Sequence, residues 1–390
     1  MKIYIDNAAT TPMSCLVREI SMQCIDEYGN PSSIHSMGRK ASKALETSRN
    51  TIARFLNCKS QEIYFTASGT ESCNWAIEIA AKIGENKRKK HIISSCIEHH
   101  AVLHSLEKLT KSGFEVTYIP VNEKGIVSTK EFEQCIRNDT IFATIMCANN
   151  EIGTIQPISE IGQICRDKGV LFHTDAVQAA GHLPIDTMTQ NIDMLSMAAH
   201  KFHGPKGIGV LYCRKNIPIV PLVVGGGQEK GKRAGTENVA AAVGMAAALK
   251  ASCETMVEVN EKIIFMRNKL INELGKIPRS RLNGDKYKRL PGIVNFCFEG
   301  IEGESLLLML DMAGVYASSG SACASESLEP SHVLLALGLP REIAHGSLRL
   351  SLGEFNRPEE IEYIIKIVPP IIERLRNMSP LWEKITKKEG

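Results

Sequence analysis

The stretch that decides the fold is VLFHTDAVQ, residues 170–178. Its apolar, β-branched run Val170–Thr174 predicts a buried strand, and Asp175 follows at the carboxyl end of that strand. Ligands of open α/β sheets bind beyond this end of the strands. A carboxylate there is costly to desolvate unless it meets a positive partner, and a protonated ring nitrogen would be one. For Asp175 taken alone, the alternative is an ordinary helix N-cap.

Similar apolar runs alternate with segments of helical period on both sides of this stretch. The runs expected as buried strands are Ile63–Thr66, His91–Ser95, Phe114–Ile119, Thr140–Cys147, Val170–Thr174, Ile192–Met197 and Gly207–Cys213. The segments expected as helices between them include Ser72–Lys82, Val102–Lys111 and Ser159–Lys168. Alternation of this kind indicates an α/β fold with a mostly parallel sheet. The S-x-x-E spacing of Ser128–Glu131 predicts a helix start, and Gly169 predicts a helix end.

The length of 390 residues exceeds the size at which one hydrophobic core stops growing, roughly 250–300 residues, so two domains or one elaborated domain are expected. A long helical stretch over 237–274, rich in Ala, Met, Glu and Lys, is expected to bridge the two parts. The elements expected after it are strand Ile293–Phe298, helix Glu304–Met312, strand Leu348–Leu352 and helix Pro358–Asn377.

The composition excludes several classes of protein. The net charge of +3 is too small to argue for nucleic acid or a membrane surface, and the basic run 87–90 is typical of a solvated loop. We expect no membrane span, because no stretch of about 18 uncharged apolar residues occurs, and no signal peptide at the N-terminus. The twelve cysteines are scattered and form no C-x-x-C pair, which favours a reducing cytosol over a zinc site or a disulfide framework.

The pair His200-Lys201 stands between two expected buried strands and is followed by Gly204-Pro205-Lys206-Gly207. A lysine on a rigid turn of this kind can be held partly desolvated, which lowers its pKa and frees its amine for Schiff-base formation. A surface lysine is the usual alternative. One αβ crossover separates Asp175 from Lys201 and places both at neighbouring strand ends, which favours a functional role.

Two glycine-containing stretches suit a phosphate group. Ser68-Gly69-Thr70-Glu71 follows an expected strand and opens a helix, where backbone N–H groups attract anions and Thr70 adds a hydroxyl. An ordinary capped helix is the alternative. The glycine-dense, basic segment 225–237 also ends at a helix start and offers Thr236, and a flexible linker is its alternative.

One cysteine differs from the others in its surroundings. In ASSGSACASES, residues 317–327, small residues surround Cys323, so the segment is expected to be mobile and its thiol exposed, as a reactive thiol must be. Other cysteines lie in apolar runs, where a free thiol acts as a small hydrophobe. These are Cys147, Cys165, Cys213 and Cys297.

Taken together, the motifs resemble the cysteine desulfurases of the nitrogen-fixation and iron–sulfur-cluster type, within the class-V aminotransferase family of fold-type I pyridoxal-phosphate enzymes. The matching motifs run nearly end to end, at residues 6–11, 29–33, 69–72, 98–99, 149–151, 173–178, 200–201, 233–236, 318–323 and 348–351. The resemblance implies a large domain with a mostly parallel seven-stranded sheet and a smaller α+β domain. It divides the chain into an N-terminal arm packing with the small domain (1–14), a large cofactor-binding domain (15–255) and a small domain carrying Cys323 (256–390).

The resemblance also implies the roles of individual residues. Lys201 binds the cofactor covalently and moves the substrate Cα proton, His99 stacks over the pyridine ring and acts in proton transfer, and Cys323 attacks the substrate sulfur. The residues expected to hold the cofactor or the substrate are Gly69, Thr70, Ala198 and His200 near the phosphate, Asp175 at the ring nitrogen, Gln178 at the phenolic oxygen, Thr236 reaching the phosphate from the other subunit of a dimer, and Asn150 and Arg349 at the substrate carboxylate. No role is assigned to His100.

One departure from the family pattern concerns the phosphate. Relatives often carry Ser or Cys followed by Gly before the His-Lys pair, where this chain has Ala198-Ala199. The missing side-chain contact is expected to weaken cofactor binding by about 0.5–1.5 kcal/mol, or up to ~3 for a charged partner.

The implied reaction takes sulfur from L-cysteine through a ketimine of pyridoxal phosphate, releases L-alanine and leaves a persulfide on Cys323. A cytoplasmic homodimer would pass the sulfur to an acceptor protein such as an iron–sulfur scaffold, with no nucleic-acid or membrane partner. The long insert between Gly320 and Ser331 resembles the long-loop branch of the family. Open alternatives are a selenocysteine lyase or aminotransferase of the same fold, and a non-catalytic sulfur or cluster scaffold. Whether Cys323 is transiently an iron–sulfur ligand also stays open.

Overall fold

The computed structural model describes residues 2–320, 329–380, 382 and 383. Cys323, the predicted sulfur carrier and candidate iron–sulfur ligand, lies outside the described residues. All other residues to which the sequence analysis assigned a role lie inside them.

Seven strands form the main sheet, in the order β2-β8-β7-β6-β5-β3-β4. The strands are β2 (Ile63–Thr66), β3 (His91–Ser95), β4 (Glu115–Ile119), β5 (Thr140–Thr144), β6 (Leu171–Asp175), β7 (Met194–Ala198) and β8 (Gly209–Cys213). β8 runs antiparallel to both β2 and β7, and every other neighbouring pair is parallel. The predicted α/β fold with a mostly parallel seven-stranded sheet is therefore confirmed.

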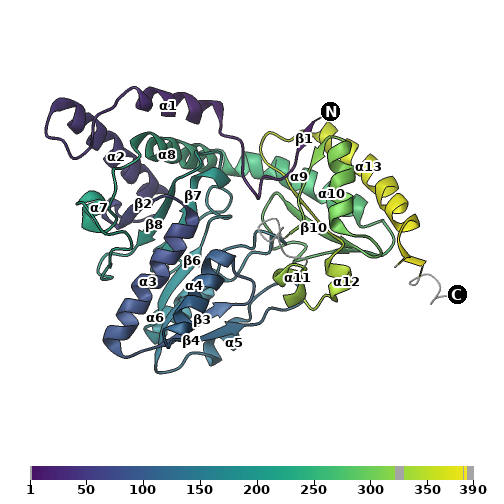
Figure 1. The fold of residues 1–390 in the computed structure, drawn as a ribbon, viewed down its shortest axis with the longest axis horizontal. Helices are drawn as coiled ribbons and strands as arrows, with labels where there is room; N and C mark the ends of the chain where they lie inside the picture. Colours follow the sequence, from purple (N-terminus) through teal and green to yellow (C-terminus); the bar gives the residue numbers. More distant parts are fainter. Residues whose placement is uncertain (1, 321–328, 381, 384–390) are drawn as a thin grey trace.

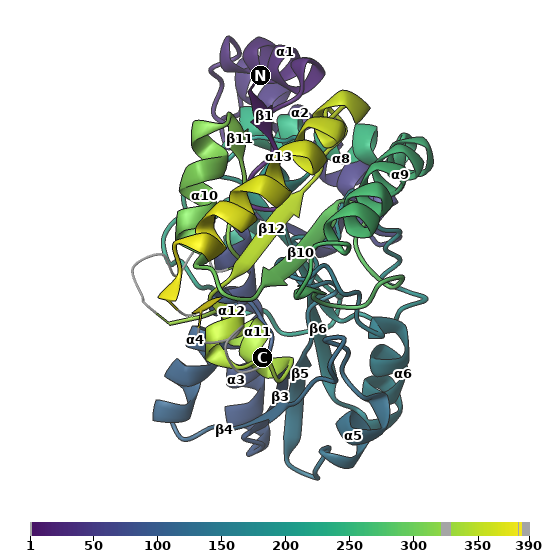
Figure 2. The same cartoon turned by 90° about the vertical axis from the view of Figure 1, so that its right-hand side faces the viewer.

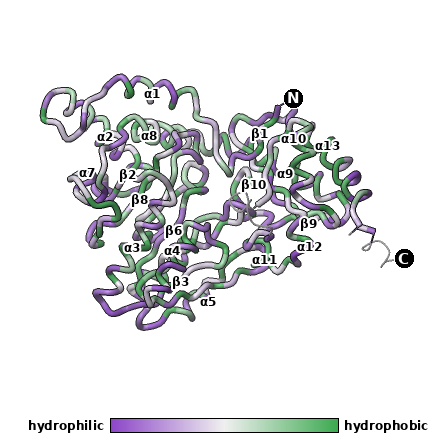
Figure 3. The backbone as a smooth tube through the Cα atoms, viewed as in Figure 1, coloured by the Kyte–Doolittle hydropathy of each residue, from purple (hydrophilic) through white to green (hydrophobic). Residues whose placement is uncertain are grey.

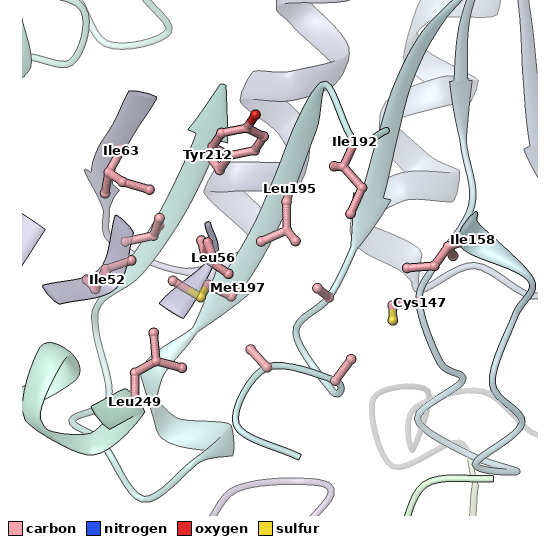
Figure 4. Packing of buried hydrophobic residues seen from close by; sticks show 14 of the residues in the cluster. Ile52, Leu56, Ile63, Cys147, Ile158, Ile192, Leu195, Met197, Tyr212 and Leu249 are labelled. Carbon is pink, nitrogen blue, oxygen red and sulfur yellow. The ribbon is translucent and has the colours of Figure 1, made fainter. Parts of the chain in front are cut away.

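Helices cover both faces of this sheet (Figure 1). They are α1 (Cys15–Ile25), α2 (Ser36–Phe55), α3 (Gly69–Lys87), α4 (His100–Lys111), α5 (Thr129–Gln134), α6 (Ile158–Lys168), the short α7 (Gln228–Gly231) and α8 (Val239–Glu254). On one face, α2, α6 and α8 bury apolar side chains against the strands, and Figure 4 shows Ile52, Leu195 and Leu249 within this cluster. On the other face, α3 and α4 form a second buried cluster that contains Trp75.

The predicted helix boundaries are confirmed by their hydrogen bonds. Ser128 is the N-cap of α5, and its hydroxyl accepts from the Glu131 N–H at 3.3 Å. Gly169 ends α6 with φ 66°, a left-handed conformation that glycine adopts without a steric penalty.

The helical stretch over 237–274 is broken, unlike the single bridge that the sequence predicts. α8 ends at Glu254, α9 (Met256–Leu274) begins two residues later, and the two axes differ by 71°. At the break, the Thr255 hydroxyl donates back to the Ala251 carbonyl at 3.0 Å. α8 packs against α1 and α2, whereas α9 packs against the C-terminal helix, so the bend carries the chain from one core to another. Among the described residues no single helix is long and apolar enough to span a membrane, and only this bent pair meets the criterion together.

A second, three-stranded antiparallel sheet lies beyond the bend, in the order β12-β10-β9. Its strands are β9 (Ser280–Leu282), β10 (Ile293–Phe298) and β12 (Ser347–Ser351), and its helices are α9, α10 (Gly303–Met312), α11 (His332–Ala336), α12 (Arg341–Ala344) and α13 (Pro358–Asn377). Figure 2 shows α13 lying along β12, with β10 beside β12. Ile361, Ile364 and Val368 of α13 belong to the buried cluster of this sheet, and Figure 3 shows hydrophobic and hydrophilic residues alternating along the helix.

The N-terminal residues connect the two sheets. β1 (Ile3–Tyr4) pairs with β11 (Val315–Tyr316), and Asp6 forms a bridge with Ser351 of β12. The chain then crosses to the main sheet, where the Thr11 N–H donates to the His200 carbonyl at 2.9 Å. The division into 1–14, 15–255 and 256–390 stays a prediction.

Candidate functional site

A cavity of about 300 Å³ opens at the carboxyl ends of β6 and β7, where the main sheet meets the second part of the molecule. Its walls come from both sheets, from the starts of α3 and α4 and from the N-terminal residues. Ten of the residues predicted to act in catalysis or binding line it, namely Gly69, Thr70, His99, Asn150, Asp175, Gln178, Ala198, His200, Lys201 and Arg349. The fold thus brings together residues that lie up to 280 positions apart in the sequence (69 to 349).

Asp175 is the last residue of β6 and is 7% exposed. Its Oδ1 accepts from the Val177 N–H at 2.9 Å, which closes a short turn; no helix begins there, so the N-cap alternative is wrong. Burial raises the pKa of Asp175, while the nearby His99 and the Val177 N–H act against this rise. A buried carboxylate in this position suits a positively charged partner.

Lys201 follows β7 at the end of a short 3₁₀ helix (Ala199–Lys201). Its Nζ donates to the Ala8 carbonyl at 2.6 Å and to the Ala9 carbonyl at 2.8 Å. The N-terminal residues therefore hold the amine at the cavity wall. The neighbouring His200 shares a hydrogen bond of 3.1 Å with Thr10, and burial, with the charge of Lys201, lowers the pKa of His200 to about 4.

The start of α3 forms another wall. Ser68 caps the helix, with its Oγ accepting from the Glu71 N–H at 3.1 Å, so the capped-helix reading holds. The same helix start opens into the cavity through Gly69 and Thr70. A Cβ at position 69 would come within 2.6 Å of Val177 Cγ2, so this helix can approach the turn after Asp175 only with glycine there. The N–H groups of such a start favour an anion.

His99 and Gln178 hold fixed positions in the remaining walls. His99 is the N-cap of α4, and its Nδ1 accepts from the Ala101 N–H at 3.1 Å. The Gln178 side-chain amide donates to the Ala8 carbonyl at 2.8 Å. Both contacts are to backbone groups, so each side chain is oriented by its own element or by the N-terminal residues.

Arg349 of β12 is 2% exposed and forms the cationic side of the cavity. Its Nη2 pairs with Asp6 Oδ1 at 2.9 Å, and its Nη1 donates to the Asn150 carbonyl at 3.0 Å. Its buried Nε has no hydrogen-bond partner among the described residues. An unsatisfied guanidinium donor at a cavity wall fits a ligand carboxylate.

Two of the residues predicted near the phosphate place no polar side chain in this cavity. Thr236 lines a separate hollow of about 110 Å³ together with Glu229 and Arg233, so its role toward another subunit stays a prediction. Ala198 does line the cavity, but its side chain offers no polar atom there.

Two buried carboxylates of the cavity were assigned no role by the sequence analysis. Glu98 Oε1 accepts from the Ser95 hydroxyl at 2.5 Å and from the Met146 N–H at 2.9 Å, whereas its buried Oε2 has no hydrogen-bond partner among the described residues. Burial raises the pKa of Glu98 to about 8. The other carboxylate is Glu151. The sequence does contain a signal for both carboxylates, because Glu98 and Glu151 stand in the family motifs 98–99 and 149–151, next to His99 and Asn150.

His100, which was assigned no role, also lines the cavity. Its ring centroid lies 4.9 Å from that of His104 and 4.9 Å from that of His332. Burial lowers the pKa of His100, and the neighbouring histidines lower it further. No group of three or more His, Cys, Asp or Glu suited to a metal ion occurs in the described part of the chain.

The predicted inert cysteines are buried, as expected. Burial raises the pKa of Cys147 to about 12 and that of Cys297 to about 11, and it also raises the pKa values of Cys165 and Cys213. Thiols of this kind are poor nucleophiles at neutral pH.

The residues present fit pyridoxal phosphate. The α3 start suits its phosphate, buried Asp175 suits its basic ring nitrogen, and the Lys201 amine suits its aldehyde. Arg349, whose Nε has no hydrogen-bond partner in the part of the chain that the structure describes, suits the carboxylate of an amino acid.

The aminotransferase class-V family profile matches residues 3–364. The chain belongs to the class-V aminotransferase family. Within this family, it is similar to cysteine desulfurase IscS of Clostridium botulinum (strain Hall), with 51% identity over 392 residues that cover 100% of this chain and 98% of the relative. Cysteine desulfurase IscS of Methanosarcina thermophila is 52% identical over 383 residues, covering 98% and 95%.

Two solved structures of similar fold agree with these sequence matches. A NifS-like protein superposes with a TM-score of 0.91 at 39% identity, covering 96% of this chain and 100% of that one. A structure of SspA in complex with cysteine gives a TM-score of 0.80 at 37% identity, covering 92% and 100%. The predicted resemblance to class-V cysteine desulfurases and the predicted fold are therefore confirmed. Class-V aminotransferases of this kind use pyridoxal phosphate.

Proposed function

We propose that this chain is a cysteine desulfurase that takes sulfur from L-cysteine, releases L-alanine and carries the sulfur as a persulfide on Cys323. The observation that supports the proposal most is the single cavity that unites buried Asp175, Lys201 and Arg349. The relatives named cysteine desulfurase, at about half identity over the full chain, support the choice of substrate and reaction.

The cofactor of the proposed enzyme is pyridoxal phosphate, held covalently on Lys201. Gly69, Thr70 and His200 hold its phosphate, Asp175 pairs with its ring nitrogen, Gln178 contacts its phenolic oxygen and His99 lies against its ring, with Thr236 added from the partner in a homodimer. Bound there, the cofactor withdraws electrons from the bonds to the substrate Cα.

The side chains of the cavity bind the substrate and move its proton. Arg349 and Asn150 hold the L-cysteine carboxylate, and the Arg349 Nε that has no partner among the described residues supplies one donor. Lys201 takes the Cα proton at Nζ, because the Ala8 and Ala9 carbonyls already orient this amine within the cavity.

Cys323 then receives the sulfur. Its thiolate attacks the substrate sulfur and forms an S–S bond while the substrate Cβ–S bond breaks. The electron pair of the broken bond stays on Cβ, which takes up a proton and becomes the methyl group of L-alanine. One substrate thiol and one protein thiol thus give L-alanine and one persulfide. We propose that the persulfide sulfur passes to an acceptor protein such as an iron–sulfur scaffold, in the cytoplasm, where free cysteines such as those of this chain persist.

The test is Cys323→Ser in the cofactor-loaded enzyme, with the exposed Cys15→Ser as the matched control. Cys323→Ser is expected to abolish alanine formation from L-cysteine and persulfide labelling of the protein, and to keep the visible absorbance of the bound cofactor. Cys15→Ser is expected to keep all three. Undiminished alanine formation by Cys323→Ser would contradict the persulfide step and favour a selenocysteine lyase or an aminotransferase. A chain that gains no visible absorbance from added pyridoxal phosphate would instead favour a non-catalytic scaffold.

A further inference from the structure

Glu151 occupies a fixed position at the back of the cavity. It is 5% exposed and lies in the turn after β5. Its backbone N–H donates to Asn149 Oδ1 at 2.9 Å, and its carbonyl accepts from the Asn295 amide of β10 at 3.0 Å. The neighbouring Asn149 and strand β10 of the second sheet therefore fix the backbone of Glu151, and its carboxylate is presented from a rigid support.

The carboxylate holds the chain on the C-terminal side of the Cys323 segment. The Ser331 hydroxyl donates to Glu151 Oε2 at 2.5 Å. The same hydroxyl oxygen caps α11 by accepting from the Val333 N–H at 3.1 Å and from the Leu334 N–H at 3.4 Å. Ser331 thus links the start of α11 to Glu151 through one side chain.

The same carboxylate oxygen packs against the chain on the N-terminal side. Gly320 is buried, and a Cβ at this position would collide with Glu151 Oε2. Two residues earlier, Ser318 exchanges backbone hydrogen bonds with Arg349, at 2.7 and 3.3 Å. Glycine is needed at 320 because the backbone passes directly over the carboxylate.

The two charged groups that act on Glu151, Arg349 and His99, both belong to the proposed reaction. Burial raises the pKa of Glu151 to about 7, and the Ser331 hydroxyl, Arg349 and His99 act against this rise. Burying a carboxylate costs free energy. In this position the Glu151 carboxylate accepts a hydrogen bond from Ser331 and lies directly against Gly320.

We propose that Glu151 is a positioning residue of the sulfur-transfer step, because its carboxylate accepts a hydrogen bond from Ser331 and lies directly against Gly320, on the two sides of the Cys323 segment, at the cavity wall. Fixing both ends of a short chain segment restricts the volume that its thiol can reach and raises the concentration of the thiol at the substrate sulfur. In the proposed reaction Glu151 touches neither the cofactor nor the substrate sulfur. It acts only through its contacts with Gly320 and Ser331. The inference rests on the proposed function.

The test separates substrate binding from sulfur transfer in the cofactor-loaded enzyme. Mixing with L-cysteine is followed by the absorbance change of the cofactor, which reports binding, and by the rate of persulfide labelling at Cys323 in a single turnover. Glu151→Ala is expected to slow persulfide formation on the order of 10- to 100-fold, while the absorbance change stays within about threefold of the wild type. Glu62→Gln is the matched control, since this buried carboxylate caps Lys59 and Lys215 away from the cavity, and it is expected to leave both rates unchanged.

Further variants keep the inference testable if Glu151→Ala does not fold. Ser331→Ala is expected to slow persulfide formation as Glu151→Ala does, and Ser331→Thr, which keeps the hydroxyl, is expected to restore it to within about threefold. Gly320→Ala is expected to slow the step in the wild type and to have a smaller effect in Glu151→Ala, where the colliding oxygen is gone.

The possible failures are distinguishable. A wild-type rate of persulfide formation in Glu151→Ala or Ser331→Ala would overturn this inference and leave the proposed function standing. A parallel fall of both rates, without recovery in Ser331→Thr, would also overturn it and assign Glu151 to substrate binding or folding. Wild-type enzyme that forms no persulfide at Cys323 would overturn the proposed function and this inference together.

Discussion

Glu98 makes the stability of this protein depend on pH in a direction opposite to that of most carboxylates. Its side chain is fully buried, two donors satisfy Oε1, and Oε2 has no hydrogen-bond partner among the described residues. The folded protein therefore holds Glu98 in its neutral form more readily than water does. Burial raises its pKa to about 8 from an ordinary value of 4.5, and the charge of Asp175 acts in the same direction.

The size of the effect follows from this difference. A gap of about 3.5 between the folded and unfolded pKa values corresponds to about 5 kcal/mol, at about 1.36 kcal/mol for each pKa unit. Because the folded pKa is the higher one, the folded state binds the extra proton. The contribution of Glu98 to stability is fully present below pH 4.5 and is lost as the pH rises through about 8.

Glu98→Gln removes this dependence, because a glutamine stays neutral and its oxygen can still accept from Ser95 and Met146. The variant is expected to match the wild type near pH 4.5 and to become more stable than it by up to about 5 kcal/mol above pH 8. The measurement is urea unfolding of both cofactor-free proteins between pH 5 and 9, followed by tryptophan fluorescence. Ser95→Ala serves as an internal control: it removes a donor that lowers the Glu98 pKa, so the decline in stability is expected to extend to higher pH. The reasoning would be refuted if the difference in the free energy of unfolding between Glu98→Gln and the wild type stayed constant, or fell, as the pH rises.

Two further predictions concern the walls of the cavity. Gly69→Ala is expected to weaken cofactor binding about 5- to 150-fold in an absorbance titration, because the new Cβ overlaps Val177 and such overpacking costs about 1–3 kcal/mol. Val177→Ala in the same chain is expected to recover most of this affinity, and no recovery would contradict the steric explanation. Arg349→Lys is expected to lower kcat/KM for L-cysteine about 10- to 150-fold in an alanine assay, since one charge-assisted hydrogen bond contributes about 1.5–3 kcal/mol. A change below twofold would exclude Arg349 from carboxylate binding.

The strands could be predicted closely because strands that are buried on both faces are continuous apolar runs. β2, β3, β10 and α13 begin and end where the sequence predicts. The run Thr140–Cys147 was predicted three residues too long, since β5 ends at Thr144. Its remaining residues still bond along the sheet, with the Cys147 N–H donating to the Asp175 carbonyl at 2.8 Å.

The bend at Thr255 was not predictable from local pattern. Residues on both sides favour a helix, and the break is set by the two different cores against which α8 and α9 pack. A local pattern carries no information about which core a helix meets.

Site residues could be predicted where the residue type has a characteristic chemistry and stands at the end of a predicted strand or the start of a predicted helix. Asp175, Lys201 and Gly69 are of this kind. The positions of Glu98 and Glu151 could not be predicted in this way. Glutamate is usually exposed. The buried carboxylate of Glu151 accepts a hydrogen bond from the Ser331 hydroxyl, 180 residues away in the sequence. Only the folded chain shows that the carboxylate has such a partner.

The contacts of Lys201 with Ala8 and Ala9 also make the assembly of the site depend on the order in which the chain is synthesised. The carbonyls of Ala8 and Ala9 hold the lysine amine, while Ile5 and Asn7, just before them, exchange backbone hydrogen bonds with Ser351 at 2.8 and 3.1 Å. Synthesis runs from residues 5–9 toward residue 351, so the ribosome makes these residues long before their partner Ser351. A growing chain therefore carries Lys201 long before it can complete the wall that orients it.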